Sequence, residues 1–216
     1  MEYYKLKGFS LAEVLLGLTI VGVIAAILIS PLINHLNEEQ LRIAWKSTYA
    51  RLSNATQMMT MQDFGGDLSN LYNEAHASWV DERNLDYIRD NFAKYLNSIK
   101  ECDVYSSLGN NGCWHEEGNW TTLSGGEPLE LGGSGGTPYI AAYHSRMVLN
   151  NGVLIAFRDY SIGCNGSSVV KNDACGSMVV DVNGFSKPNK VGKDIYAVQI
   201  TKTGALIPYG TKNDAW

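Results

Sequence analysis

The chain begins with a short polar stretch, continues with one long apolar run, and is mostly polar after that. From Phe9 the run reads FSLAEVLLGLTIVGVIAAILIS, and Glu13 is its only charged residue between positions 11 and 29. At the ~1.5 Å rise of an α-helix these positions cover about 28 Å, close to the ~30 Å hydrocarbon core of a membrane. The pattern therefore predicts a transmembrane helix over residues 9–33.

Two simpler explanations of this run fit less well. A cleaved signal peptide has a shorter apolar core followed by a small-residue cleavage site, and no clear site of that kind follows here. A plain signal anchor leaves Glu13 unexplained, because an acid in a membrane helix costs a few kcal/mol and is usually functional. An alternative in which Glu13 lies at the membrane edge stays open. Lys5 and Lys7 precede the run, which places the start of the chain in the cytoplasm and the remainder outside.

The helical pattern continues beyond the apolar run as an amphipathic helix over residues 34–62. The apolar face of this part recurs at steps of four and three and comprises Leu41, Trp45, Thr48, Leu52, Ala55 and Met59. Phe64-Gly65-Gly66 is expected to end the helix near Gln62. Pro31 removes a helical hydrogen bond, so we expect a bend or local melting at that position.

Residues 63–216 form the predicted globular domain. Apolar spacing from Leu85 to Ile99 predicts a second helix that ends near Cys102, and the Gly-rich residues 103–140 are typical of a long surface loop. Strand signals follow, with predicted hairpins at 147–157 and 195–208 and a single strand at 178–182. The expected fold class is α+β, with a long N-terminal helix packed on a C-terminal antiparallel sheet.

Charge and motif content exclude two broad classes of function. The net charge is −5 and no Lys/Arg block occurs, which argues against nucleic acid as the main partner. No G-x-S-x-G, H-E-x-x-H or paired-carboxylate pattern is present, and the four histidines lack metal-ligand spacing. We therefore expect no enzymatic activity. A membrane-anchored enzyme is the alternative, but it would have no need of Glu13.

The four cysteines suggest disulfides in an oxidising compartment. Four cysteines allow three connectivities, and proximity in the sequence favours Cys102–Cys113 and Cys164–Cys175. Each short loop would stabilise the fold by roughly 2–3 kcal/mol in the chain-entropy model. Four reduced, buried thiols remain the alternative.

The first thirty residues resemble the class III signal of type IV prepilins and type II secretion pseudopilins. The resemblance rests on Lys5-Leu6-Lys7-Gly8, on Phe9-Ser10-Leu11-Ala12-Glu13, and on the apolar run from Val14. It implies that residues 1–8 are a leader, that a prepilin peptidase cuts between Gly8 and Phe9, and that Phe9 is N-methylated. It also implies that Glu13 pairs with the Phe9 amine of a neighbouring subunit.

The same resemblance implies a pilin-like fold and a set of partners. The protein would be a single-pass inner-membrane protein that joins a homo- or heteropolymer of pilin-like subunits through an inner-membrane assembly platform. The polymer would be a periplasmic or extracellular filament. Many members carry the helix-kinking proline at the position of Ser30, whereas Pro31 lies one residue later here, so detailed packing does not transfer. An alternative is a minor pilin that acts as a tip adhesin or DNA-uptake module, with its ligand site in residues 103–145.

One loop is a candidate calcium site, and no other cofactor is expected. Asp181, Asn183, Asn189 and Asp194 supply oxygen ligands around a Gly-containing turn, and calcium prefers such hard oxygens. Some major pseudopilins hold calcium near the corresponding region. No EF-hand spacing is present, and the alternative is a loop stabilised by its own Asx-turn hydrogen bonds.

Overall fold

The structure is a computed structural model. The residues that it describes are 10–76, 84–103, 112–116, 121, 145–160, 162–165 and 173–208. The chain divides into two compact units, Met1–Gln40 and Leu41–Trp216. The leader and Phe9 lie outside the described residues.

Helix α1 spans Leu11–Gln62 and contributes to both units. Its end at Gln62 is the predicted one, and Gly65 and Gly66 follow with positive φ angles of 62° and 90°, a backbone that favours glycine. The expected melting at Pro31 is not found, because the backbone stays helical through that residue. A proline inside a helix removes one hydrogen bond without preventing its neighbours from continuing the helix.

In the first unit, α1 is an exposed apolar helix. Residues Leu11–Ile29 have a mean hydropathy of 2.6 and none of this stretch is buried. By length and composition it can cross a membrane.

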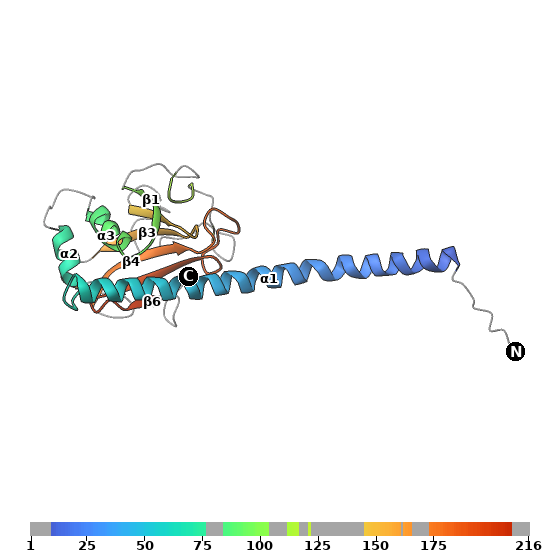
Figure 1. The fold of residues 1–216 in the computed structure, drawn as a ribbon, viewed down its shortest axis with the longest axis horizontal. Helices are drawn as coiled ribbons and strands as arrows, with labels where there is room; N and C mark the ends of the chain where they lie inside the picture. The colour runs from blue at the N-terminus through green and yellow to red at the C-terminus, as the bar shows by residue number, and fades with distance from the viewer. Residues whose placement is uncertain are drawn as a thin grey trace. The chain divides into compact units, whose positions relative to one another are not determined.

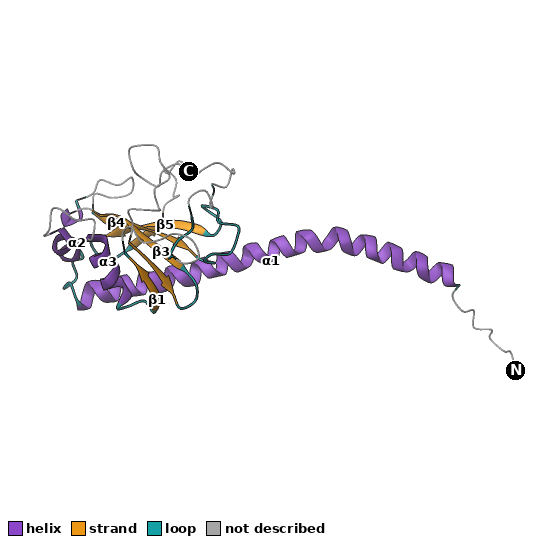
Figure 2. Ribbon diagram, turned by 90° about the horizontal axis from the view of Figure 1, so that it is seen from above, coloured by secondary structure: helices purple, strands orange, loops and turns teal. Residues whose placement is uncertain are grey.

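In the second unit, α1 is followed by two short helices, α2 (Ser69–His76) and α3 (Asn84–Ala93). They lie together at one end of the domain in both ribbon views (Figures 1 and 2). The predicted second helix is therefore partly wrong, because it ends at Ala93 instead of near Cys102. Ile99 belongs to a strand and is 69% exposed, so its helical spacing from Phe92 did not mark a core position.

A six-stranded antiparallel sheet fills the rest of the described domain, with its strands in chain order. The strands are β1 (Ser98–Cys102), β2 (Ser145–Leu149), β3 (Leu154–Tyr160), β4 (Ala174–Asp181), β5 (Ile195–Thr201) and β6 (Leu206–Pro208), with the short 3₁₀ helix η1 (Ile162–Cys164) after β3. Both predicted hairpins form, as β2–β3 and β5–β6. The α+β fold class is confirmed.

The sheet is buried on both faces, and side-chain alternation assigns residues to each face. One face joins the main core with α1, where Leu52 and Met59 pack with Met147, Ile155 and Val198 among others. Figure 1 shows this half of α1 lying along the sheet. The second face carries a separate cluster around Trp114, which includes Val148, Leu154, Ala156, Val179 and Ala197.

Candidate functional site

The first turn of α1 holds the one acid of the apolar segment in a local hydrogen-bond pair. The backbone N–H and the hydroxyl of Ser10 donate to Glu13 Oε2, at 2.8 and 2.9 Å. The Glu13 N–H donates back to Ser10 Oγ at 3.3 Å. This reciprocal arrangement is a capping box. The sequence analysis selected Glu13 but missed Ser10, although the Ser-x-x-Glu spacing is the sequence signature of a capping box.

The apolar segment after Glu13 presents large side chains on every side. Leu11 is 80% exposed, Leu18 65% and Ile27 67%. An apolar surface of this extent requires a partner that is itself apolar, either lipid or other helices.

The inward face of the second half of α1 is attached to the sheet by aromatic side chains. Trp45 stacks on Tyr196 with ring centroids 4.2 Å apart, and Tyr49 donates its hydroxyl hydrogen to the Leu206 carbonyl at 2.7 Å. These contacts fix the helix against β5 and β6 in addition to the buried Leu52 and Met59. The opposite face of the helix is left exposed.

Both disulfides form with the pairing expected from proximity. Cys102 bonds to Cys113 and Cys164 bonds to Cys175, so the chain has no free cysteine. The first links the end of β1 to the segment 112–116, and the second links η1 to β4. Each disulfide therefore ties a connecting segment to the sheet, which limits the freedom of the unfolded chain.

The expectation of a surface loop over residues 103–140 is wrong for the segment 112–116. Cys113, Trp114 and His115 are exposed by no more than 4%, because the segment packs on the second face of the sheet. His115 Nε2 lies 2.8 Å from Asp181 Oδ2 at the end of β4. This buried pair was not predicted, because its two residues are 66 positions apart. The other residues of the expected 103–140 loop lie largely outside the described part of the chain.

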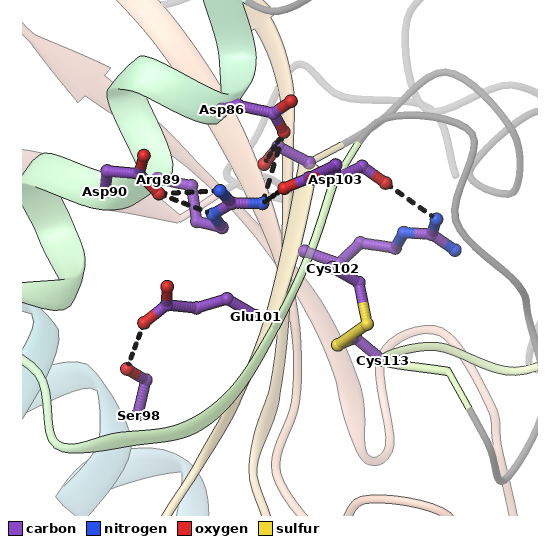
Figure 3. A network of polar contacts seen from close by, with 10 residues as sticks. Asp86, Arg89, Asp90, Ser98, Glu101, Cys102, Asp103 and Cys113 are labelled. Carbon is purple, nitrogen blue, oxygen red and sulfur yellow. Dashed lines mark hydrogen bonds and ion pairs between the residues drawn. A yellow bond between two sulfur atoms is a disulfide. The ribbon is translucent and has the colours of Figure 1, made fainter.

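A second polar network joins α3 to the segment that follows β1 (Figure 3). Arg89, only 5% exposed, contacts Asp90 at 2.6 Å, Asp103 at 2.8 Å and Asp86 at 3.2 Å. The Ser145 hydroxyl on β2 donates to Asp86 at 2.6 Å. The guanidinium therefore connects a helix, the residue after Cys102, and β2 through Asp86.

The candidate calcium residues form a loop held by its own hydrogen bonds. Both carboxylate oxygens of Asp194 accept backbone N–H groups, from Asn189 at 2.8 Å and from Lys190 at 2.6 Å. Asp181 accepts the Asn183 N–H at 3.0 Å, and the Asn183 amide donates to the Lys187 carbonyl at 3.1 Å. These hydrogen bonds fit the alternative given by the sequence, in which Asx turns of the loop itself stabilise it.

Burial raises the pKa of Asp181 to about 6, with the nearby Asp194 adding to the rise and the His115 hydrogen bond opposing it. Among the described residues, no group of three or more His, Cys, Asp or Glu is arranged to hold a metal. Calcium binding therefore stays a prediction, testable by titrating calcium against thermal unfolding.

The remaining predicted sites are only partly covered by the structure. Gly8 and Phe9, which frame the expected cleavage site, lie outside the described residues, as does most of the 103–145 region expected to hold a ligand site in a minor pilin. Comparison with protein-family models, with curated proteins and with solved structures finds no match to this chain.

Proposed function

We propose that this chain is a type IV pilin-like structural subunit that polymerises through its N-terminal helix into an extracytoplasmic filament. The filament is either a pilus or the pseudopilus of a type II secretion system. One observation carries the proposal. The same helix that packs on the domain begins as an exposed apolar segment with one acid, Glu13, in its first turn. In an enzyme or a simple anchored domain, this acid would only cap the helix with Ser10, at a cost of a few kcal/mol in lipid.

The leader and the charges of Lys5, Lys7 and Glu13 suggest the order of insertion, cleavage and assembly. Membrane insertion covers the apolar segment, with Lys5 and Lys7 on the cytoplasmic side. Cleavage between Gly8 and Phe9 then creates a positive amine a few residues from Glu13. An amine and a carboxylate that are each costly in lipid become acceptable as a pair between neighbouring copies. That pairing would set the axial register of the polymer.

The two disulfides support an extracytoplasmic domain, because disulfides persist in oxidising compartments. The partners in this proposal are a prepilin peptidase, the inner-membrane assembly platform and other pilin-like subunits. The domain needs no catalytic centre for this role.

Processing is tested by intact mass and N-terminal sequencing of the protein from native membranes or filaments. We expect a chain that starts at Phe9 with one added methyl group. A start at Met1 or Glu2 would refute processing by a prepilin peptidase and favour a membrane-anchored binding protein or enzyme.

Assembly is tested by Glu13→Ala as the sole copy of the chain. We expect normal insertion and cleavage but at least about a tenfold fall in filament yield, since tenfold corresponds to only ~1.4 kcal/mol of lost pairing. Thr19→Ala is the matched control in the same segment, because Thr19 only donates to the Leu15 carbonyl of its own helix, at 2.8 Å. Filament yield equal to the wild type for Glu13→Ala would refute the pairing.

A further inference from the structure

The loop between β4 and β5, residues 182–194, has a positively charged surface and is called here the basic loop. Lys187, Lys190 and Lys193 recur at every third position, and each is exposed or partly exposed. The one acid of the loop, Asp194, is completely buried and accepts two backbone N–H groups of the loop itself. The loop therefore presents three positive charges at the surface of a chain whose net charge is −5.

An aromatic side chain accompanies these lysines. Phe185 is 37% exposed, and its ring meets the ring of His115 edge-on, with centroids 5.5 Å apart. A partly exposed aromatic ring beside lysines is the composition that favours the interface between water and lipid headgroups.

Hydrogen bonds hold the basic loop in shape. The side-chain amide of Asn183 donates to the Lys187 carbonyl at 3.1 Å, and the Tyr196 hydroxyl donates to the Lys193 carbonyl at 2.6 Å. The Lys190 N–H donates to Asp194, also at 2.6 Å. The backbone at all three lysines is therefore fixed before any partner binds, which lowers the cost of binding.

The basic loop lies at the end of the domain where α1 enters it. Tyr196 follows the loop on β5 and stacks on Trp45 of α1, with ring centroids 4.2 Å apart. Trp45 lies shortly after Leu41, where the domain unit begins. The loop is therefore beside the part of α1 that leads back to the apolar segment.

The length of α1 limits how far this end of the domain is from lipid. Ile33 ends the predicted membrane span, and Arg42 follows nine positions later. At ~1.5 Å per residue this is about 14 Å of helix. Headgroups extend roughly 5–7 Å beyond the hydrocarbon core, which leaves about 8 Å, and the Debye length at physiological salt is also ~8 Å. Lysines at this end therefore attract anionic headgroups across the remaining gap.

Acidic residues of α1 oppose this attraction without cancelling it. Glu38 and Glu39 precede Arg42 and Lys46 on the helix, so that two negative and two positive charges balance there. The basic loop adds three positive charges, and its acid is buried. The loop therefore sets the sign of the charge at this end of the domain.

We propose that the basic loop docks the domain of the unassembled subunit on the anionic phospholipid headgroups of the membrane that α1 spans. Because α1 anchors the loop beside the membrane, the contact is in effect intramolecular and a weak attraction suffices. The proposal rests on membrane insertion, which is one part of the proposed function, and is independent of cleavage and polymerisation. A second copy of the chain is the competing partner for the lysines.

Spin labelling of the full-length chain in nanodiscs tests the contact directly. A nitroxide on Ser186→Cys reports collisions with a lipid that carries nickel on its headgroup, in nanodiscs that hold one chain each. We expect frequent collisions when half of the lipid is phosphatidylglycerol, and few in phosphatidylcholine alone or in 0.5 M salt, where the Debye length falls to roughly 4 Å. A nitroxide on Ile99→Cys of β1 is the control and should respond to neither change.

Two triple substitutions with the same loss of charge show which lysines act. Lys187→Gln/Lys190→Gln/Lys193→Gln should lower the ratio of docked to undocked domain at least about tenfold, which corresponds to ~1.4 kcal/mol. Lys94→Gln/Lys100→Gln/Lys202→Gln removes three lysines from α3, β1 and the turn after β5, and should leave that ratio unchanged. Thermal unfolding of both variants shows that the domain stays folded, and the lipid and salt comparisons on the wild type need no variant.

The outcomes separate this proposal from the proposed function. Equal collision frequencies in the two kinds of nanodisc, or docking of the loop variant like that of the wild type, overturn the docking alone. Contact that appears only in nanodiscs holding two or more chains identifies a second copy as the partner and also overturns it. A chain that alkaline extraction releases from native membranes is not inserted, which overturns the proposed function and the docking together.

Discussion

Asp181 lies in a buried pair with His115, and the protonation of Asp181 is coupled to folding. Asp181 is fully buried, and burial raises its pKa to about 6 from an ordinary value of 3.8. The folded chain therefore binds this proton more tightly than the unfolded chain does. The stability that Asp181 contributes is complete below pH 3.8 and is lost as pH rises through 6.

The resulting prediction is that Asp181 makes the domain more stable at pH 5 than at pH 7, by about 1 kcal/mol. Thermal unfolding of the wild type and of Asp181→Asn at pH 7, 6 and 5 measures the effect, because the variant lacks the titrating group. Glu116→Gln removes an exposed acid beside His115 and serves as the control. Equal pH dependence of the wild type and Asp181→Asn would contradict the prediction.

Gly204, in the turn between β5 and β6, lies directly against α1. Its φ is +76°, and an added Cβ would collide with the Thr60 hydroxyl and lie 3.3 Å from the Thr56 carbonyl oxygen. We expect Gly204→Ala to lower the free energy of unfolding by about 2–3 kcal/mol, from backbone strain together with the collision. Urea denaturation measures the change.

Gly152 provides the control for this substitution. It has a φ of +85° in the β2–β3 turn, but an added Cβ would meet nothing within 4 Å. Gly152→Ala should therefore cost only the backbone strain, about 1–2 kcal/mol. If both variants lose the same free energy of unfolding, the close approach of Gly204 to α1 does not add to the cost of the substitution.

At the scale of elements, Arg89 is the main polar link between α3 and the segment after β1 (Figure 3). Arg89→Met would remove one cationic partner of Asp86, which is only 16% exposed. We expect a loss of about 2 kcal/mol, less than for a fully buried pair because Asp90 and Asp103 are more than half exposed and can be hydrated. Chemical denaturation gives the loss, and amide hydrogen exchange should show earlier opening of α3.

Two further variants make the Arg89 prediction specific. Asp90→Asn removes one exposed partner and should change stability by less than ~0.5 kcal/mol. Arg89→Lys keeps the charge but loses the fork of donors, so it should fall between the wild type and Arg89→Met. An Arg89→Met protein as stable as the wild type would show that α3 is held by its apolar residues alone.

At the scale of the whole molecule, both core clusters lie within the unit that begins at Leu41. A fragment of residues 41–216 should therefore be soluble and fold with the thermal midpoint of the full chain in detergent. Circular dichroism and thermal unfolding test this. A fragment from Ser53 lacks Leu52 and Trp45, and should lose several kcal/mol or fail to fold. A 41–216 fragment that aggregates without cooperative unfolding would mean that the domain depends on the apolar segment.

The local patterns of the sequence determined the elements whose signals lie within a few residues of each other. The helical period and the following glycines predicted the end of α1 at Gln62, and alternation with Gly-containing turns predicted the hairpins β2–β3 and β5–β6. The short separation of each cysteine pair indicated both disulfides. The apolar run and Glu13 also come from sequence alone, since composition and length decide whether a helix suits a membrane.

Only the tertiary structure decided the features that depend on distant segments. Ser98–Cys102 is a strand because β2 pairs with it, and pairing across more than forty positions overrides a weak helical period. The residues around Trp114 are buried because the sheet has a second apolar face to cover. His115 meets Asp181, and Arg89 meets Asp103, through the register of the sheet and the packing of α3.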